Sequence, residues 1–498
     1  MNTANFSVLM LCAVVNTASA EIYEVNTNAE LEDANYKVQA GDTVNINHGV
    51  YSVSIQPMRS GAADRPITYQ AVKNGPVTFS GDTLVAVLLS NRSFIQVIGI
   101  KVESVFRFLE IEEGDHHIIE HCIFRNSIAY AGCYLRNAHH NRFLSNTFSS
   151  DTSYGGGDLL KMTSNDGDGN FPNRFKGESG SDYNLVEGNY FGQCSHGCVM
   201  NRGKYNVIRR NIFDNPFHIN LFASLEYTFG SPGGSGDGEF SVFEYNVIRN
   251  SGPAFRLSGI QCQSPNNIFR FNEIYNNKGN GIELSIYGPP GDSAYYCNNN
   301  RIYHNVIYGH DSLTYSTFRN DNKWGRNYGI AFRNYLEGKS IDSSRIFNNI
   351  LYKNHEPQIQ GDIGENTYIG PNQKLGDPLF IEKEGRDFRL RKNSPFIDKG
   401  ISIAKTSGKG RGTSIHLATG DAYNFCDGFG IIRGDRIWIN QQEAIITEVD
   451  YAGDRIKIDR ALTWPAGAEI TFPYAGAAPD CGAYEYGMEI PSISDLVR

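Results

Sequence analysis

The sequence lacks any internal apolar stretch that could cross a bilayer, which takes about 20 consecutive apolar residues. It also lacks an excess of positive charge, because 45 Lys and Arg stand against 54 Asp and Glu and leave a net charge of −9. A negative chain is not attracted in bulk to nucleic acid or to an anionic membrane. We therefore expect neither nucleic acid nor membrane as a partner, and any acidic ligand must find a local basic patch.

Cysteines with a His partner at zinc-ligand spacing are also missing, although Cys194 and Cys198 lie only four residues apart. Eight cysteines follow Cys12, and an even number permits disulfides in an exported protein, but spacing alone does not pair them. The cysteines therefore indicate packing or disulfide formation and not a zinc site. Tryptophan is also scarce, with 3 residues against 28 Tyr and 29 Phe.

The first 20 residues resemble a secretory signal. An apolar run from Phe6 to Val15 is followed by small residues that end at Ala20, before Glu21. No Lys or Arg precedes the run, which departs from the usual pattern. We predict a signal peptide over residues 1–20 and a secreted or periplasmic protein.

A short step recurs through the middle of the chain, in which an Asn stands before an apolar pair. Two steps are separated by only 22 residues, from Asn189 to Asn211, and two by 25, from His121 to Asn146. These gaps are typical of one turn of a solenoid built from short strands. The steps begin at His121, Asn146, Asn189, Asn211, Asn246, Asn272, Asn305 and Asn349.

Buried Asn side chains can donate to and accept from the backbone of the coils above and below, so we expect the recurring Asn to form a ladder. A second polar position lies five residues before each step, as at Asn141 and Asn184, and an apolar residue lies between the two, as at Phe143. Each unit is too small to bury its own face and must stack on its neighbours. The pattern predicts an all-β parallel β-helix solenoid.

The ends of the chain differ from the repeats. Residues 28–34 indicate a short amphipathic helix, which would cap the exposed end of the stack. Between Gly400 and Ala475 the repeat stops and alternating strands with Gly-containing turns indicate a small antiparallel β barrel. We predict a β-helix over residues 21–401, an inserted β domain over 402–475, and a final β-helix strand and tail over 476–498.

The motifs near the N-terminus indicate a particular kind of β-helix protein. The run from Gly41-Asp42-Thr43 through Gly49-Val50-Tyr51 and Pro66-Ile67-Thr68 to the turn at Gly81 resembles the start of right-handed parallel β-helix polysaccharide lyases, particularly the chondroitinase B and alginate lyase family. Closing motifs such as Asp377-Pro378-Leu379-Phe380 resemble the last coils of secreted β-helix proteins. The resemblance implies a right-handed parallel β-helix with lyase activity. The Lys, Arg and calcium ligands that the family implies cannot be placed here residue by residue.

Strand alternation predicts two outward columns on one face of the stack, with members about 4.8 Å apart. Long Gly-rich loops beside these strands are typical of groove walls. A solvated sheet face with cross-strand ion pairs is the purely structural interpretation. The first column contains Glu110, Tyr134, Lys161, Val199, Asn220, Arg256, Glu283 and Ala331, and the second Glu112, Arg136, Thr163, Asn201, Phe222, Ser258, Ser285 and Arg333.

Cleavage beside a uronic acid by β-elimination needs a cation at the sugar carboxylate, a base for the neighbouring proton and a donor for the leaving oxygen. Arg256 suits the carboxylate because its guanidinium is permanently charged and binds in bidentate fashion. His196, His218 or Lys161 could exchange the protons. We predict these four residues as catalytic, and Arg136, Asn201, Asn220, Glu283 and Arg333 as substrate-binding.

One loop carries alternating oxygen ligands separated by glycine. Asp166, Asp168 and Asn170 could surround a calcium ion, although the bidentate Glu of an EF-hand is missing and a solvated acidic turn fits equally well. Calcium is therefore the one cofactor that the sequence predicts.

These observations predict a secreted, monomeric polysaccharide lyase that acts on an acidic polysaccharide of the alginate, pectin or glycosaminoglycan type. Three different functions fit the same scaffold. A glycoside hydrolase would need two carboxyl groups about 5–10 Å apart. A uronate epimerase would share the lyase chemistry, and a non-catalytic glycan-binding surface protein would need no positioned base. The sequence does not decide between them.

Overall fold

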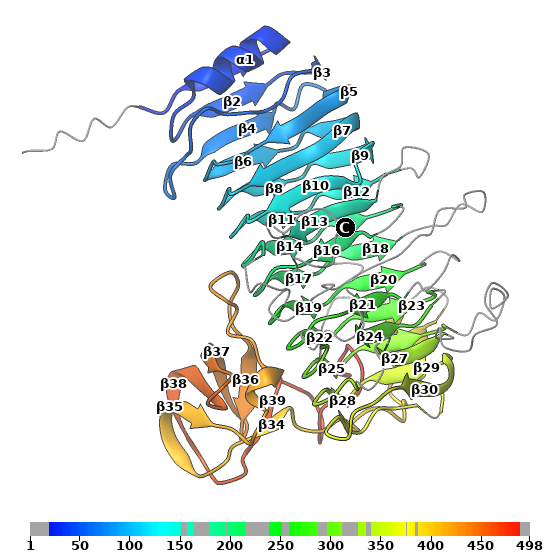
Figure 1. The fold of residues 1–498 in the computed structure, drawn as a ribbon. Helices are drawn as coiled ribbons and strands as arrows, with labels where there is room; N and C mark the ends of the chain where they lie inside the picture. The colour runs from blue at the N-terminus through cyan, green and yellow to red at the C-terminus, as the bar shows by residue number, and fades with distance from the viewer. Residues whose placement is uncertain are drawn as a thin grey trace, which may run out of the picture.

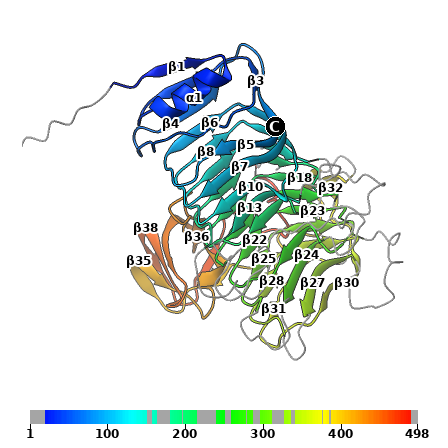
Figure 2. The ribbon, with the colours of Figure 1, turned by 45° about the horizontal axis from the view of Figure 1, so that its top comes forward.

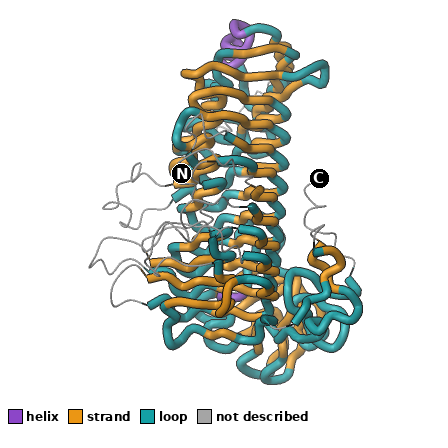
Figure 3. The backbone as a smooth tube through the Cα atoms, turned by 90° about the vertical axis from the view of Figure 1, so that its right-hand side faces the viewer, coloured by secondary structure: helices purple, strands orange, loops and turns teal. Residues whose placement is uncertain are grey.

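The computed structural model shows a long stack of coils with a short helix at one end and a small antiparallel sheet beside the other (Figure 1). It describes residues 19–150, 157–163, 180–194, 197–214, 239–250, 258–277, 279–286, 296–310, 327–334, 340–374, 376–383 and 387–488. Viewed from the side, the strands of successive coils lie one above another along the stack (Figure 3). The parallel β-helix predicted from the Asn repeat is confirmed.

Most coils contribute one strand to each of three faces. The first face is a 13-stranded parallel sheet. Its strands are β1 (Ile22–Val25), β2 (Thr43–Ile46), β4 (Ile67–Ala71), β6 (Ile95–Ile98), β8 (Ile118–Glu120), β11 (Arg142–Leu144), β14 (Leu185–Glu187), β17 (Val207–Arg209), β19 (Val242–Glu244), β22 (Ile268–Arg270), β25 (Arg301–Tyr303), β28 (Arg345–Phe347) and β31 (Tyr368–Ile369).

The second face follows the first along the chain. It contains β3 (Gly49–Tyr51), the first halves of β5 (Val77–Leu88) and β7 (Lys101–Glu112), and then β9 (Ile123–Ser127), β12 (Thr147–Ser149), β15 (Tyr190–Phe191), β18 (Ile212–Asp214), β20 (Val247–Arg249), β23 (Glu273–Tyr275), β26 (Val306–Tyr308) and β29 (Ile350–Tyr352). Because β7 pairs with β9 through its first half and with β10 through its second, it joins this face to the third.

The third face is described in two groups of strands. The group nearer the helix holds the second halves of β5 and β7 with β10 (Ala131–Arg136), β13 (Asp158–Thr163) and β16 (Val199–Asn201), and the other holds β21 (Ile260–Cys262), β24 (Ile282–Ile286), β27 (Tyr328–Asn334) and β30 (His355–Gly361). Figure 2 shows β7, β10 and β13 side by side, with β24, β27 and β30 farther along the stack.

The buried Asn ladder is present. In the side chain of Asn211, the amide oxygen accepts from Nδ2 of Asn189 at 3.0 Å, and the amide nitrogen donates to Oδ1 of Asn246 at 3.1 Å and to the carbonyl of Val186 at 2.9 Å. The same pattern runs through Asn272, Asn305 and Asn349 and ends at Asn372. The ladder satisfies backbone groups at the coil corners, which would otherwise be buried without partners.

We expect Asn211→Ala to lower the free energy of unfolding by about 3 kcal/mol, because it leaves a backbone N–H and a carbonyl without partners inside the stack. Asn45→Ala, which removes an outward amide from β2, is the matched control and is expected to cost about 0.5 kcal/mol or less. Denaturant unfolding of both variants measures the difference, and equal losses would contradict the structural role of the ladder.

The predicted cap is α1 (Asn28–Lys37), which closes the N-terminal end of the stack. The hydroxyl of Thr27 accepts from the Glu30 amide at 3.2 Å, which satisfies one of the free N–H groups of the first turn. Leu31 and Ala34 are buried against the first coils. The helix therefore covers apolar surface that the first coil would otherwise expose. Among the residues described, no helix is long and apolar enough for a membrane span.

The antiparallel sheet lies where the sequence places the insert. Its strands are β34 (Ala404–Lys405), β35 (Gly410–His416), β36 (Arg436–Ile439), β37 (Gln442–Asp450), β38 (Arg455–Trp464) and β39 (Glu469–Thr471), in the order β34-β39-β36-β37-β38-β35. It packs on the outer side of the first face, where Val242, Ile268 and Tyr303 share one apolar cluster with its residues. The Tyr303 hydroxyl donates to the carbonyl of Asn424 at 2.6 Å.

Arg270 fastens the insert to the stack through a buried ion triad. Its guanidinium lies 2.8 Å from the carboxylate of Glu244 on the neighbouring coil and 2.6 Å from that of Asp435 in the insert. The Arg270 side chain is 3% exposed, so the triad is almost fully withdrawn from water.

Another segment, toward the C-terminus, covers the outer side of the second face. A hairpin of β32 (Phe380–Glu382) and β33 (Asp387–Leu390) packs with Tyr484 against Tyr275 and Val306. The sequence predicts a final β-helix strand and tail over residues 476–498. Residues 476–488 form turns, with the Gly482 amide donating to the carbonyl of Asn348 at 2.8 Å, and residues 489–498 lie outside the described residues. The outer sides of the first and second faces are thus covered toward the C-terminal end.

A carboxyl group lies under this cover. Burial raises the pKa of Glu273 to about 8, although the Tyr484 hydroxyl donates to its carboxyl oxygen. The folded protein therefore holds a proton on Glu273 between about pH 4.5 and 8, where the unfolded chain has lost it. This stabilisation is complete below about pH 4.5 and disappears as the pH rises through about 8.

We expect the melting temperature of Glu273→Gln to fall less between pH 5 and 8 than that of the unsubstituted protein, because glutamine carries no titrating proton. The difference in slope corresponds to at most about 1.4 kcal/mol per pH unit. Thermal unfolding at a series of pH values measures it, and parallel curves would show that Glu273 does not carry this dependence.

Candidate active-site face

The third face aligns polar side chains in columns, as the alternation of its strands predicts. Tyr134 pairs with Glu110 on one side and with Lys161 on the other, and Arg136 pairs with Glu112 and Thr163. Adjacent members of such a column lie about 4.8 Å apart. The first three positions of both predicted columns are therefore confirmed.

Lys161 is the most buried cation of this group. It lies on β13, is 4% exposed, and has its ammonium nitrogen 5.7 Å from the ring centroid of Tyr130 and 5.9 Å from that of Tyr134. Two aromatic faces offset part of the cost of removing a charge from water. Tyr130 is 54% exposed, so this pair of rings links the buried ammonium to the surface.

Gly157 makes the approach of Tyr130 to β13 possible. A Cβ atom at this position would lie 2.5 Å from the Tyr130 carbonyl oxygen and 2.7 Å from its ring. Any larger residue would push the ring away from the start of the strand. A short glycine run, Gly155-Gly156-Gly157, precedes β13 in the sequence and is consistent with this close contact.

Two arginines complete the first group of strands. Arg107 pairs with the Glu110 carboxylate and places its guanidinium carbon 4.9 Å from the Tyr134 ring centroid. Arg136 lies 2.5 Å from the Glu112 carboxylate. Cations and aromatic rings therefore alternate over three coils, with two carboxylates that hold the arginines in place.

The second group of strands surrounds a buried carboxylate. Glu283 on β24 is fully buried and accepts from Ser258 at 2.9 Å and from Asn280 at 3.0 Å, while Arg333 on β27 lies 3.5 Å away. The structure thus brings together the predicted binding residues Glu283 and Arg333. It also corrects the register, because the residue opposite Glu283 is Gln261 and not Arg256.

Asn201 does not belong to the outward columns. Lys161 pairs with Met200 and Met162 with Asn201, so β16 is shifted by one residue from the prediction, which set Lys161 opposite Val199. The Asn201 amide donates to Ser241 at 3.0 Å and accepts from Asn206 at 2.7 Å, within the buried polar ladder. The prediction that Asn201 faces the substrate is wrong, because a shift of one residue turns a side chain to the other side of a sheet.

Several predicted site residues lie outside the described residues. They are His196, His218, Asn220, Arg256 and the calcium ligands Asp166, Asp168 and Asn170. In the described part of the chain, no group of three or more His, Cys, Asp and Glu side chains is placed to hold a metal ion. The predicted calcium site thus remains a prediction.

Tyr130, Gly157 and Arg107 also belong to this face, although the sequence pattern does not place them there. Tyr130 and Gly157 come just before β10 and β13, where strand alternation does not yet fix the direction of a side chain. Arg107 lies in the bend of β7 between two faces. The glycine run before β13 was the one available signal, since it marks a close contact of the backbone.

Comparison with known proteins supports the fold. A sequence model of the Chondroitinase B family matches residues 25–106, which end within β7. No curated protein matches the chain. The match covers the first coils alone, and the described strands beyond it continue the same parallel β-helix.

Solved structures of polysaccharide lyases are similar at low identity. A family PL6 polysaccharide lyase from Pseudopedobacter saltans is 15% identical, over 75% of this chain and 96% of its own, with a TM-score of 0.47. A pectate lyase is 13% identical over 94% and 97%, also at 0.47. A mannuronic acid specific family 6 lyase from human gut microbiota is 12% identical over 72% and 92%, at 0.44. These likenesses concern the fold alone.

Proposed function

We propose that this protein is a polysaccharide lyase that cleaves a uronic-acid-containing polysaccharide by β-elimination on the third face of its β-helix. The observation that carries the proposal is the buried Lys161 between Tyr130 and Tyr134, on a face lined by arginines. The family match to residues 25–106 supports the same chemistry.

The reaction sets the requirements for the site. A base removes the proton from the carbon that bears the carboxylate, a double bond forms to the next carbon, and the bond from that carbon to the glycosidic oxygen breaks. The leaving oxygen then takes up a proton. A cation beside the carboxylate stabilises the charge that develops during proton removal.

We assign the base to Lys161, whose amine can accept the proton when it is neutral. Tyr130 and Tyr134 place hydroxyl-bearing rings beside the ammonium group and suit the return of a proton to the leaving oxygen. Arg107 and Arg136 can exchange their carboxylate partners on the face for a sugar carboxylate of the same shape. His196, His218 and Arg256 remain predicted contributors on the same face.

A glycoside hydrolase is the second candidate, and one observation favours it. Glu110 and Glu112 are two residues apart on β7, which brings two carboxyl groups to the same side of one strand, as a hydrolase pair requires. Both carboxylates form ion pairs with arginine, however, and an acid catalyst must hold a proton. This arrangement supports a lyase better than a hydrolase.

Incubation with a panel of alginate, pectin and glycosaminoglycans tests the proposal. We expect ultraviolet absorbance from an unsaturated product together with new reducing ends. Reducing ends alone would indicate a hydrolase, altered sugar composition without cleavage an epimerase, and binding without products a glycan-binding protein. Each of these three outcomes would overturn the lyase assignment.

Calcium and export are further parts of the proposal. If Asp166, Asp168 and Asn170 hold calcium, a chelator lowers activity and added calcium restores it. If residues 1–20 are a signal peptide, the mature protein begins near Glu21 and acts outside the cytoplasm, as a monomer, where acidic polysaccharides are found. N-terminal sequencing of the exported protein checks the cleavage point.

A further inference from the structure

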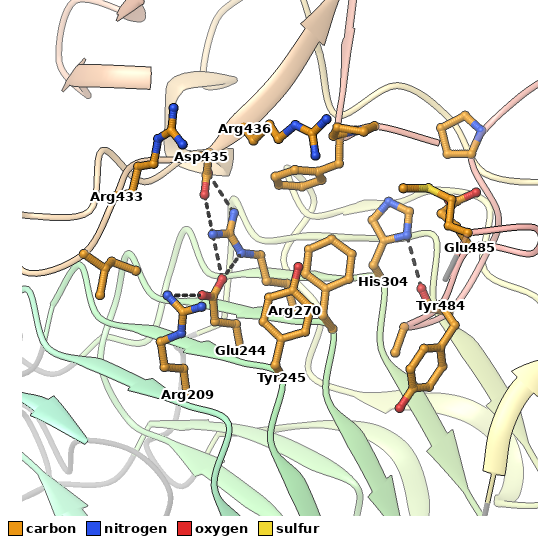
Figure 4. Close-up of a pocket in the computed structure, with 18 of the residues that line it drawn as sticks. Arg209, Glu244, Tyr245, Arg270, His304, Arg433, Asp435, Arg436, Tyr484 and Glu485 are labelled. Carbon is orange, nitrogen blue, oxygen red and sulfur yellow. Dashed lines mark hydrogen bonds and ion pairs between the residues drawn. The ribbon is translucent and has the colours of Figure 1, made fainter. Parts of the chain in front are cut away.

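A cavity of about 270 Å³ lies between the insert and the outer side of the first face (Figure 4). Arg209, Glu244 and Arg270 border it from β17, β19 and β22, while Asp435 and Phe472 come from the insert and Glu485 from the C-terminal segment. The volume is just below the ~300 Å³ at which pockets for drug-sized ligands begin, so it suits a unit the size of one sugar.

More basic than acidic side chains line the cavity. Four arginines line it, against Glu244, Asp435 and Glu485. Arg270 shares the carboxylates of Glu244 and Asp435. Arg436 makes one exposed pair with Glu443 at 2.6 Å, and Arg433 is exposed and forms no ion pair with any residue that the structure describes. Arg433 and Arg436 are therefore the cations available to an anion.

Glu485 adds a carboxyl group of which only one oxygen is hydrogen-bonded within the described residues. One carboxyl oxygen accepts from the Asp480 amide at 2.8 Å, and the other is buried without a hydrogen-bond partner among the described residues. Burial, and then the charge of Asp480, raises the pKa of Glu485 to about 8. At neutral pH the side chain holds a proton and can donate it to a ligand oxygen.

Aromatic rings form the remaining wall. Tyr245 stacks on Phe271 with ring centroids 4.9 Å apart, and Phe472 meets Phe271 edge-on at 5.2 Å. Figure 4 shows the Tyr245 hydroxyl directed toward the middle of the cavity. Aromatic surface beside charged and hydroxyl groups matches a sugar, which presents C–H groups on its faces and oxygens at its edge.

We propose that this cavity is a second carbohydrate site, which binds a single uronic acid unit with its carboxylate on Arg433 and Arg436. The inference rests on the proposed function, because that function supplies the uronic acid polymer. The cavity site lies on the first face and the reaction on the third, so the two are separate. A polymer held at the cavity site would stay close to the enzyme between cleavage events.

Binding of methyl glycosides of galacturonic, mannuronic and glucuronic acid to the full chain tests the proposal, with the neutral hexoses as comparison. We expect at least one uronide to bind, its neutral counterpart to bind about 10-fold more weakly, and Arg433→Gln combined with Arg436→Gln to weaken the uronide by about 10-fold or more. Arg460→Gln is the matched control, since Arg460 is an exposed arginine of the insert paired with Asp459.

Unchanged uronide affinity in the double variant, or equal losses in the double variant and the control, would overturn the cavity site. Product formation from a short oligosaccharide, measured on the same preparations, distinguishes a failure of the cavity site from a failure of the lyase proposal. Loss of uronide binding in the double variant with no cleavage by any preparation would refute the lyase and retain the cavity site. Cleavage by all preparations with unchanged binding would do the reverse.

Discussion

Lys161→Met is expected to reduce the rate of unsaturated product formation by roughly 10²–10⁴-fold, the range that a positioned general base contributes. Methionine matches the length of lysine and is apolar, so the pocket between Tyr130 and Tyr134 stays filled while the base is lost. The expected effect falls on kcat, because the proton is removed in the reaction step and not on binding. Initial rates over a range of polymer concentrations measure it.

A matched variant separates catalysis from general damage. Lys101→Met removes a lysine from the second-face half of β7, where its partner is Glu103, and should leave the rate unchanged. Both variants should unfold at similar temperatures, since Lys161→Met replaces a buried amine with an apolar side chain and Lys101→Met removes only a partly exposed ion pair. A Lys161→Met protein that folds normally and retains its rate would remove Lys161 from the proposed mechanism.

Arg270→Ala is expected to destabilise the junction between the β-helix and the insert by about 3–5 kcal/mol, because it leaves the buried Asp435 without its cation beside Glu244, which keeps only Arg209 at 3.5 Å. Two of the three tryptophans, Trp438 and Trp464, lie on β36 and β38. Tryptophan fluorescence during denaturant unfolding therefore reports chiefly on the insert.

Lys457→Met is the matched control for this experiment. Lys457 pairs with Glu448 at 2.6 Å on the same sheet, but both side chains are nearly half exposed, and such pairs contribute about 1 kcal/mol or less. Arg270→Met extends the test, because it refills the volume without restoring the charge. If the Arg270 variants unfold at the same denaturant concentration as Lys457→Met, the triad is not what holds the insert.

The sequence predicted the repeat of the β-helix well, because the ladder requires the same residue type at the same place in every coil. Asn189, Asn211 and Asn246 bond to one another as expected. Register on the third face was predicted less well, since the loops between coils differ in length. The strand opposite β24 is Ile260–Cys262 and not residues 255–257, and β16 is shifted by one residue.

The candidate site was only partly accessible from sequence. The neighbouring positions of Tyr134 and Lys161 follow from alternation, but the approach of Tyr130 depends on the absence of a Cβ atom at Gly157. The contact between Arg270 and Asp435 joins residues 165 positions apart and has no local signal. Such contacts arise from the way the insert folds back on the stack, which no short motif encodes.

The central claim is that this β-helix breaks its polymer by elimination and not by hydrolysis. Digestion in water enriched in heavy oxygen, followed by mass spectrometry of the products, tests this claim most directly. Elimination adds no water across the broken bond, so we expect no heavy oxygen from cleavage in either product, and an unsaturated product that is lighter by one water molecule than its hydrolytic counterpart. Products that carry one heavy oxygen per cleavage, at full mass, would contradict the account.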